Sequence, residues 1–141
     1  MSAPDFPPDF PIVIFHNPAC GTSRNVVAMV RAAGYEPTIV EYLQAGWSQH
    51  ELLGLAARAG LGLKALLRTK GTPAEALGLL KEDVTAAEMV EAMLAHPILV
   101  NRPIVETPKG VKLCRPSEVV FDLLERKPDV FVKEDGEIVR P

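Results

Sequence analysis

Cys20 is the residue of this sequence with the clearest capacity for covalent chemistry, and it lies in the string FHNPACGTSRN. The apolar run PIVIF precedes this string and a helical pattern follows from Thr22, so the cysteine lies between a strand and a helix. α/β proteins bind ligands at such junctions. The free backbone N–H groups of Gly21, Thr22 and Ser23, together with the helix dipole, favour negative charge there. We therefore expect a thiolate, and a substrate oxyanion bound by these N–H groups, at this turn.

The reactivity of Cys20 depends on its pKa, because the thiolate is the nucleophile. At the usual pKa near 8.5 about 3% of a thiol is ionised at pH 7, and lowering the pKa to about 6.5 increases the thiolate roughly 25-fold. His16 precedes the same turn, and as an imidazolium it is the candidate charge partner. The alternatives are that Cys20 is a small buried filler and that His16 only hydrogen-bonds the loop. Asn17 is expected to brace the loop backbone.

The neighbours of Cys20 exclude two familiar cysteine mechanisms. A dithiol oxidoreductase needs a second cysteine in a C-x-x-C motif, and that position is Ser23. A cysteine phosphatase needs an arginine at the position that Val26 occupies, and Arg24 is offset from it. The second sulfur and the anion-binding groups must therefore come from outside this string.

Arg68, Arg102 and Arg115 are the candidate anion-binding residues. They lie in the strings ALLR, NRP and CRP. Arginine forms planar, bidentate contacts with oxyanions, so the three could hold a small dianion without a metal. The alternative is that each is a surface residue or an ion-pair partner.

The elements that must position these residues begin with a β-α-β unit. The apolar patterns predict strands at Pro11–Phe15 and Pro37–Leu43, separated by a helix that starts at Thr22 and ends near Gly34. Such crossovers are nearly always right-handed with parallel strands.

A helical block follows the second strand. Capping signals predict helices that begin at Ser48, Thr72 and Thr85, and Lys64–Arg68 is expected to form a short helix or helical turn. A His-Pro step then ends the block.

The last part of the chain returns to strands. Ile98–Thr107 and the string VKLCR predict an antiparallel hairpin around the turn PKG. The string PSEVVFDLLERK predicts a final helix, and the polar tail after it is expected to be loosely packed.

This order of elements is that of an α/β, thioredoxin-like fold with a mixed sheet and an inserted helical subdomain. We expect an extended N-terminal arm over 1–10, a thioredoxin-like domain over 11–127 with the insertion at about 48–96, and a C-terminal tail over 128–141. The length of 141 residues and the 48% of hydrophobic residues suit one such domain.

Composition excludes several classes of function. The net charge of -3 argues against a nucleic-acid binder that works through bulk electrostatics. Two cysteines are too few for a disulfide scaffold, and the scattered histidines give no zinc spacing. No apolar run approaches the length of a membrane span, and the N-terminus lacks the pattern of a signal peptide. A reducing, cytoplasmic setting is expected.

Four strings, HNPACGTSRN, ALLR, HPILVNRPIV and CRPSEVV, closely resemble the glutaredoxin-coupled arsenate reductases in order and spacing. The resemblance runs from about Ile12 to Leu124. It implies the thioredoxin-like fold with a helical insertion. It implies that Cys20 is the nucleophile that attacks arsenate and that His16 stabilises its thiolate. It also implies that the arsenate oxygens are bound by Arg68, Arg102 and Arg115. It also implies that the Arg102–Pro103 peptide is cis.

The resemblance further implies how the missing sulfur is supplied. The Cys20 thiolate displaces an oxygen of arsenate, glutathione attacks the thiol–arsenate adduct, and glutaredoxin resolves the protein–glutathione mixed disulfide as arsenite leaves. Glutathione is then a co-substrate, with no bound cofactor or metal, and the chain is expected to be a monomer. Cys114 is expected to be a proximal but non-essential thiol. The chain departs from the family in its longer N-terminal arm and in its tail, where only KEDGE matches well.

Two other functions on the same fold stay open. One is a thiol-based regulator resembling Spx, which binds RNA polymerase; Ser23 in place of a second cysteine argues against it. The other is a general glutathione-linked thiol oxidoreductase for which arsenate is incidental.

Overall fold

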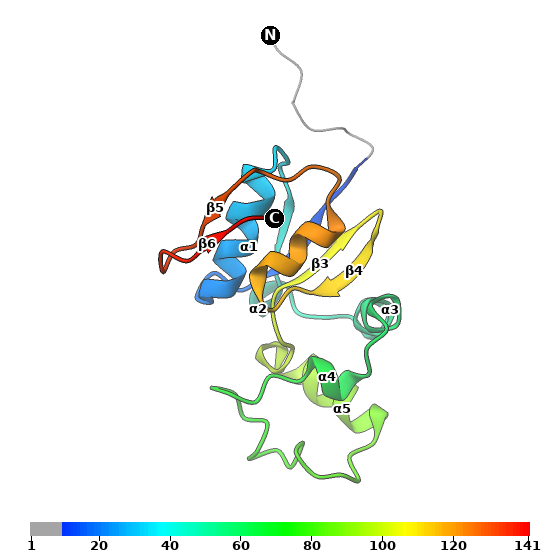
Figure 1. The fold of residues 1–141 in the computed structure, drawn as a ribbon. Helices are drawn as coiled ribbons and strands as arrows, with labels where there is room; N and C mark the ends of the chain where they lie inside the picture. Colours follow the sequence, from blue (N-terminus) through cyan, green and yellow to red (C-terminus); the bar gives the residue numbers. More distant parts are fainter. Residues whose placement is uncertain (1–9) are drawn as a thin grey trace. The chain divides into compact units, whose positions relative to one another are not determined.

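The computed structural model describes residues 10–141 and divides into two compact units. Of the described residues, the first unit combines 10–41 with Arg102–Pro141, and the second is Tyr42–Asn101 (Figure 1). The helical insertion expected at about 48–96 falls inside the second unit. The expected N-terminal arm lies outside the described residues except for Phe10, which is buried in the core beside Tyr35.

A four-stranded mixed sheet forms the centre of the first unit, in the order β2-β1-β3-β4. Its strands are β1 Val13–His16, β2 Thr38–Glu41, β3 Ile104–Thr107 and β4 Gly110–Leu113. β1 is parallel to β2 and antiparallel to β3, and β3 and β4 form a hairpin. The predicted β-α-β unit, the hairpin and the mixed thioredoxin-like sheet are therefore confirmed.

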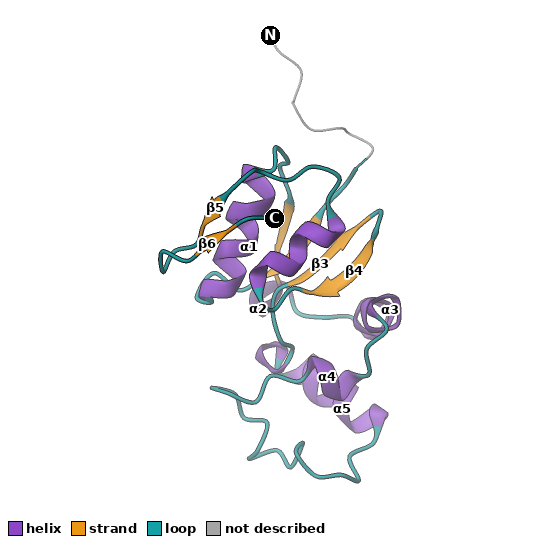
Figure 2. Ribbon diagram, viewed as in Figure 1, coloured by secondary structure: helices purple, strands orange, loops and turns teal. Residues whose placement is uncertain are grey.

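Helix α1, Gly21–Ala32, and the 3-10 helix η2, Ser117–Leu123, pack against the sheet and against each other (Figure 2). α1 forms because its apolar residues recur at helical spacing on one face. It ends before Gly34, whose φ of +95° is readily adopted only without a side chain. The core between α1, η2 and the sheet contains Ile12, Ile14, Val26, Met29, Val30, Val105, Val120, Phe121, Leu123 and Leu124.

Three predictions about the later elements need correction. The final helix is present, but it is a 3-10 helix that ends at Leu123 and is shorter than the predicted string. The strand predicted from Ile98 starts only at Ile104, because Pro97–Leu99 forms the 3-10 helix η1 and Pro103 has no N–H to donate to a sheet. The tail expected to be loosely packed contains a short hairpin.

That hairpin pairs β5, Phe131–Val132, with β6, Ile138–Val139. Phe131 and Val139 pack against the core, whereas Val132 and Ile138 are exposed. In Figure 1 the hairpin lies beside α1, and its turn approaches the first turn of that helix. Backbone pairing thus forms the hairpin, and two side chains anchor it to the core of the first unit.

The second unit is helical, as the sequence predicts for most of this block. Its helices are α2 Tyr42–Ala45, α3 Gln49–Ala59, α4 Leu63–Leu66 and α5 Ala86–Ala95, followed by η1. Ser48 and Thr85 cap α3 and α5, as predicted, and Thr85 also forms a full capping box with Glu88, which the sequence analysis did not predict. No helix among residues 10–141 is long and apolar enough to cross a membrane.

The helix predicted to begin at Thr72 does not form. The segment makes a single turn, with the Leu77 N–H donating to the Pro73 carbonyl, and Gly78 at a φ of +75° then ends it. The Thr72 hydroxyl does accept from the Ala74 N–H, as a cap would, but it also donates to the Arg68 carbonyl.

Candidate active site

Cys20 is the N-cap residue of α1, as the strand-to-helix transition predicts. The residue is 8% exposed. Its own N–H donates to the Asn17 carbonyl at 3.0 Å, which closes the turn after β1. The thiol is therefore held at the positive end of a twelve-residue helix, where the dipole favours a thiolate.

The pKa of Cys20 lies below the ordinary value of a cysteine thiol, at about 7. Burial alone would raise this pKa. Hydrogen bonds to the sulfur from the Arg102 side chain, the Ser23 backbone and the Arg115 side chain outweigh the burial. About half of the thiol is thus ionised at neutral pH, which is the state that a nucleophile needs.

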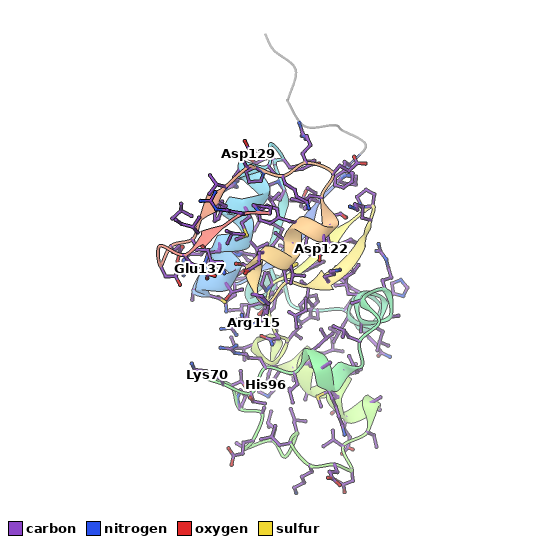
Figure 3. All side chains as sticks on the ribbon, in the orientation of Figure 1. Lys70, His96, Arg115, Asp122, Asp129 and Glu137 are labelled. Carbon is purple, nitrogen blue, oxygen red and sulfur yellow. The ribbon has the colours of Figure 1, made fainter. Side chains whose placement is uncertain are left out.

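Arg115 and Arg102 come from the two sides of the β3–β4 hairpin and meet at the Cys20 sulfur. The Arg115 Nη1 lies 3.6 Å from the Cys20 Sγ and also donates to the Arg102 carbonyl at 2.9 Å. Figure 3 shows Arg115 at the end of the sheet where β4 leads into η2. The hairpin therefore brings together two of the three arginines that the sequence singles out, as predicted.

Both arginines precede cis-prolines. The Arg102–Pro103 peptide is cis, as the family resemblance predicts. The Arg115–Pro116 peptide is also cis, which the sequence analysis did not predict.

The loop before α1 is braced by Ser23 and Asn17. The Ser23 Oγ accepts from the Asn17 N–H at 3.1 Å, and the Asn17 Oδ1 accepts from the Ala19 N–H at 2.9 Å. Ser23 is fully buried and Asn17 nearly so. Asn17 therefore holds the loop backbone as expected, and Ser23 holds the loop as well as contributing its N–H to the thiol.

His16 contacts Ser23 rather than the thiol. Its Nδ1 lies 2.6 Å from the Ser23 Oγ. Burial lowers the pKa of His16; Glu41 opposes this, and the nearby arginines add to it. The imidazole is then neutral at pH 7, so the prediction of an imidazolium that stabilises the Cys20 thiolate is not supported. The alternative that His16 hydrogen-bonds the loop agrees with this geometry.

Arg24 and Glu134 are site neighbours that the sequence analysis missed. The Arg24 Nη1 donates to the Pro18 carbonyl at 2.8 Å, and its Nε and Nη2 both donate to the Glu134 carboxylate. In the sequence, Arg24 is offset from the position of a phosphatase arginine, and that offset gives no sign of its contact with the loop. The KEDGE string that contains Glu134 was the available signal, since it was the part of the tail that still matched the family.

Cys114 is a structural cysteine. Its side chain is fully buried, and burial raises the pKa of its thiol to about 12. The sulfur lies 3.7 Å from the Lys112 carbonyl. A protonated, enclosed thiol is neither a nucleophile nor a resolving group at neutral pH.

Arg68 belongs to the second unit. Its backbone N–H donates to the Leu99 carbonyl at 2.7 Å, and its Nε donates to the Lys70 carbonyl at 3.2 Å (Lys70 is labelled in Figure 3). Its convergence on the same anion as Arg102 and Arg115 stays a prediction. Within residues 10–141 no group of three or more histidine, cysteine or acidic side chains could hold a metal ion.

The arrangement defines a class of site: a sulfur nucleophile at a helix N-terminus, with guanidinium donors directed at the same sulfur. Helix N–H groups and arginines both bind oxyanions, so the site suits thiolate attack on a small anion. The chain belongs to the ArsC family, whose sequence model matches residues 15–123.

Similar proteins carry consistent names. The chain is 58% identical over 129 residues to the arsenate reductase ArsI2 of a Synechocystis strain, a match that covers 91% of this chain and 92% of that protein. An arsenate reductase of Escherichia coli is 53% identical over 129 residues, which again cover 91% of this chain and 92% of that protein. The solved structure of an arsenate reductase from Vibrio cholerae has a TM-score of 0.78 at 33% identity, covering 82% of this chain and 98% of that one.

Proposed function

We propose that this chain is an arsenate reductase that uses Cys20 as its nucleophile and glutathione and glutaredoxin as its reductants. The observation that carries the proposal is the contact of Arg115, at 3.6 Å, with a thiol whose pKa is about 7 at the start of α1. Membership of the ArsC family, with relatives named arsenate reductase, supports arsenate as the oxyanion.

In the first step the Cys20 thiolate attacks the arsenic atom, and one arsenate oxygen leaves as water after protonation. Arg102 and Arg115 have guanidinium groups near the sulfur that can neutralise the oxygens of the incoming dianion. The N–H groups of Gly21, Thr22 and Ser23 are proposed to bind the same oxygens at the helix N-terminus. Arg68 is proposed as the third arginine of this set.

His16 is proposed to act on Cys20 indirectly. Its hydrogen bond to the Ser23 hydroxyl fixes the residue whose backbone N–H faces the sulfur. This makes His16 a positioning residue instead of the charge partner first expected.

Reduction of arsenate to arsenite needs two electrons, which two thiols supply when they become a disulfide. Cys20 can be one of them. Cys114 is fully buried, with its pKa raised to about 12, so it is a poor candidate for the second. Glutathione attack on the Cys20 adduct provides that second thiol, arsenite leaves, and glutaredoxin reduces the resulting mixed disulfide. Because each turnover consumes thiols, we propose a reducing, cytoplasmic setting.

The test is arsenite formation from arsenate with glutathione and glutaredoxin present. We expect turnover by the wild-type chain, none by Cys20→Ser, and turnover by Cys114→Ala, which serves as the matched control. Loss of activity only in Cys114→Ala would contradict the proposal. Fast reduction of a glutathionylated peptide without arsenate turnover would instead identify a general glutathione-linked thiol oxidoreductase.

A further inference from the structure

The turn of the C-terminal hairpin contacts the first turns of α1. The Glu134 carboxylate accepts two hydrogen bonds from Arg24, from Nε at 2.9 Å and from Nη2 at 3.0 Å. The Glu134 backbone N–H donates to the Asn25 Oδ1 at 3.0 Å. Three contacts thus join one residue of the tail to two consecutive residues of the helix that begins after Cys20.

Arg24 passes this contact on to the loop that carries the nucleophile. Its Nη1, the nitrogen that does not bind Glu134, donates to the Pro18 carbonyl at 2.8 Å. The planar guanidinium is therefore fixed on one edge by the carboxylate and on the other by the loop, in the fork geometry that arginine favours. Pro18 lies just before Ala19 and Cys20, so the position of Arg24 bears directly on the turn.

The same hairpin turn also contacts the segment that follows Arg115. The Lys133 Nζ lies 2.8 Å from Glu118 of η2 and 2.9 Å from Glu137 of the hairpin, and its side chain is only 9% exposed. Figure 3 labels Glu137 at this hairpin. Adjacent residues of one turn therefore bind the element after Cys20 and the element after Arg115.

We propose that Glu134 is a positioning residue for Cys20, and that the hairpin turn Lys133–Glu134 braces the Cys20 loop against the segment that carries Arg115. The inference rests on the proposed function only in taking Cys20 as the nucleophile. The brace acts through Arg24 and Pro18 on the loop, and through Glu118 on η2. It keeps the sulfur within reach of the donors that stabilise its thiolate.

An electrostatic role and a positioning role of Glu134 predict opposite changes in the Cys20 pKa when Glu134 is removed. An acidic group near a thiol disfavours the thiolate, so loss of its charge alone would lower the Cys20 pKa. Loss of the brace would lengthen the hydrogen bonds from Arg115 and the Ser23 N–H to the sulfur, and the pKa would rise. The direction of the change therefore separates a positioning role from a purely electrostatic one.

The experiment measures the rate of Cys20 alkylation by iodoacetamide against pH in the full chain. We expect Glu134→Ala to raise the apparent pKa and to lower the rate at pH 7 about threefold, which corresponds to a rise of about 0.7 in pKa. Glu134→Gln, which keeps the shape and one acceptor oxygen, should give a smaller rise. Glu36→Ala removes the carboxylate of a similar exposed ion pair with Arg31, near the other end of α1, and should leave the profile unchanged.

The route through Arg24 has its own test. Glu134→Ala should change the alkylation rate little when Arg24 is already alanine, and a full effect in that background would overturn the route. An unchanged or lowered pKa in both Glu134 variants would overturn the brace, as would an equal rise in Glu36→Ala. Thermal unfolding of each variant shows whether it is folded. Alkylation of Cys20 needs no arsenate. A chain that does not reduce arsenate can therefore still show the effect of Glu134 on the Cys20 pKa, so failure of the proposed function and failure of the brace give different results.

Discussion

Arg115 is one of two arginines that hydrogen-bond the Cys20 sulfur, so its loss should lower the reactivity of this thiol. Its Nη1 lies 3.6 Å from the sulfur, and the same nitrogen donates to the Arg102 carbonyl at 2.9 Å. The substitution Arg115→Ala removes one donor to the thiolate. It also removes a contact that holds the backbone of Arg102, the other guanidinium of the site.

The magnitude follows from the strength of a hydrogen bond to a charged group, about 1.5–3 kcal/mol net. Each unit of pKa corresponds to about 1.36 kcal/mol, and the long N–S distance favours the lower end of that range. We therefore expect the Cys20 pKa to rise from about 7 to about 8. The thiolate fraction at pH 7 would then fall from about half to about a tenth, roughly a fivefold loss of nucleophile.

The assay is the pH dependence of iodoacetamide alkylation, with Cys20→Ser as the blank for any reaction at Cys114. Arg115→Lys, which keeps the positive charge but loses the planar fork, should fall between wild type and Arg115→Ala. Arg31→Ala removes an arginine near the other end of α1 and is the matched control. A profile for Arg115→Ala that superimposes on wild type would refute the reasoning.

Three further predictions concern the neighbours of Cys20. In the native protein only Cys20 should react rapidly with a disulfide reagent. Cys114 should react only on unfolding, because it is buried with its pKa raised to about 12, and two rapidly reacting thiols would contradict this. Ser23→Ala leaves the buried Asn17 N–H without its acceptor and should lower the free energy of unfolding by about 1–3 kcal/mol in urea titrations; no loss would show that the bond is dispensable. His16→Gln, whose amide can keep a hydrogen bond to the Ser23 hydroxyl, should leave the Cys20 pKa near its wild-type value because burial keeps the imidazole neutral, whereas a rise of about one unit would support the imidazolium that the sequence suggested.

Local patterns predicted much of the fold because they have local physical causes. The change from an apolar run to helical spacing located Cys20 at the start of α1, and capping residues located the starts of α3 and α5. The helix predicted at Thr72 failed because Gly78 ends the turn after Pro73, a limit that the capping signal does not contain. The start of β3 likewise depends on the backbone around Pro97 and Pro103, and nothing in the sequence explains why the final helix is of the 3-10 type.

The parts of the site whose chemistry follows from one residue type could be predicted from the sequence. The parts whose charge state or partner depends on tertiary contacts could not. A cysteine at a helix N-terminus and arginines on one hairpin could be read from the sequence. The charge state of His16 could not, since it depends on burial and on the Ser23 hydroxyl. The contact of Glu134 with Arg24 joins residues 110 positions apart, so the KEDGE string marks the segment but does not identify its partner.

The most direct test of the central claim is to locate the sulfur that carries glutathione after a single turnover. The wild-type chain is mixed with arsenate and glutathione without glutaredoxin, quenched with acid, digested, and analysed by mass spectrometry. We predict a glutathione mixed disulfide on the peptide that contains Cys20, formed only when arsenate is present. A mixed disulfide on the Cys114 peptide, or one on Cys20 that forms equally fast without arsenate, would contradict the account.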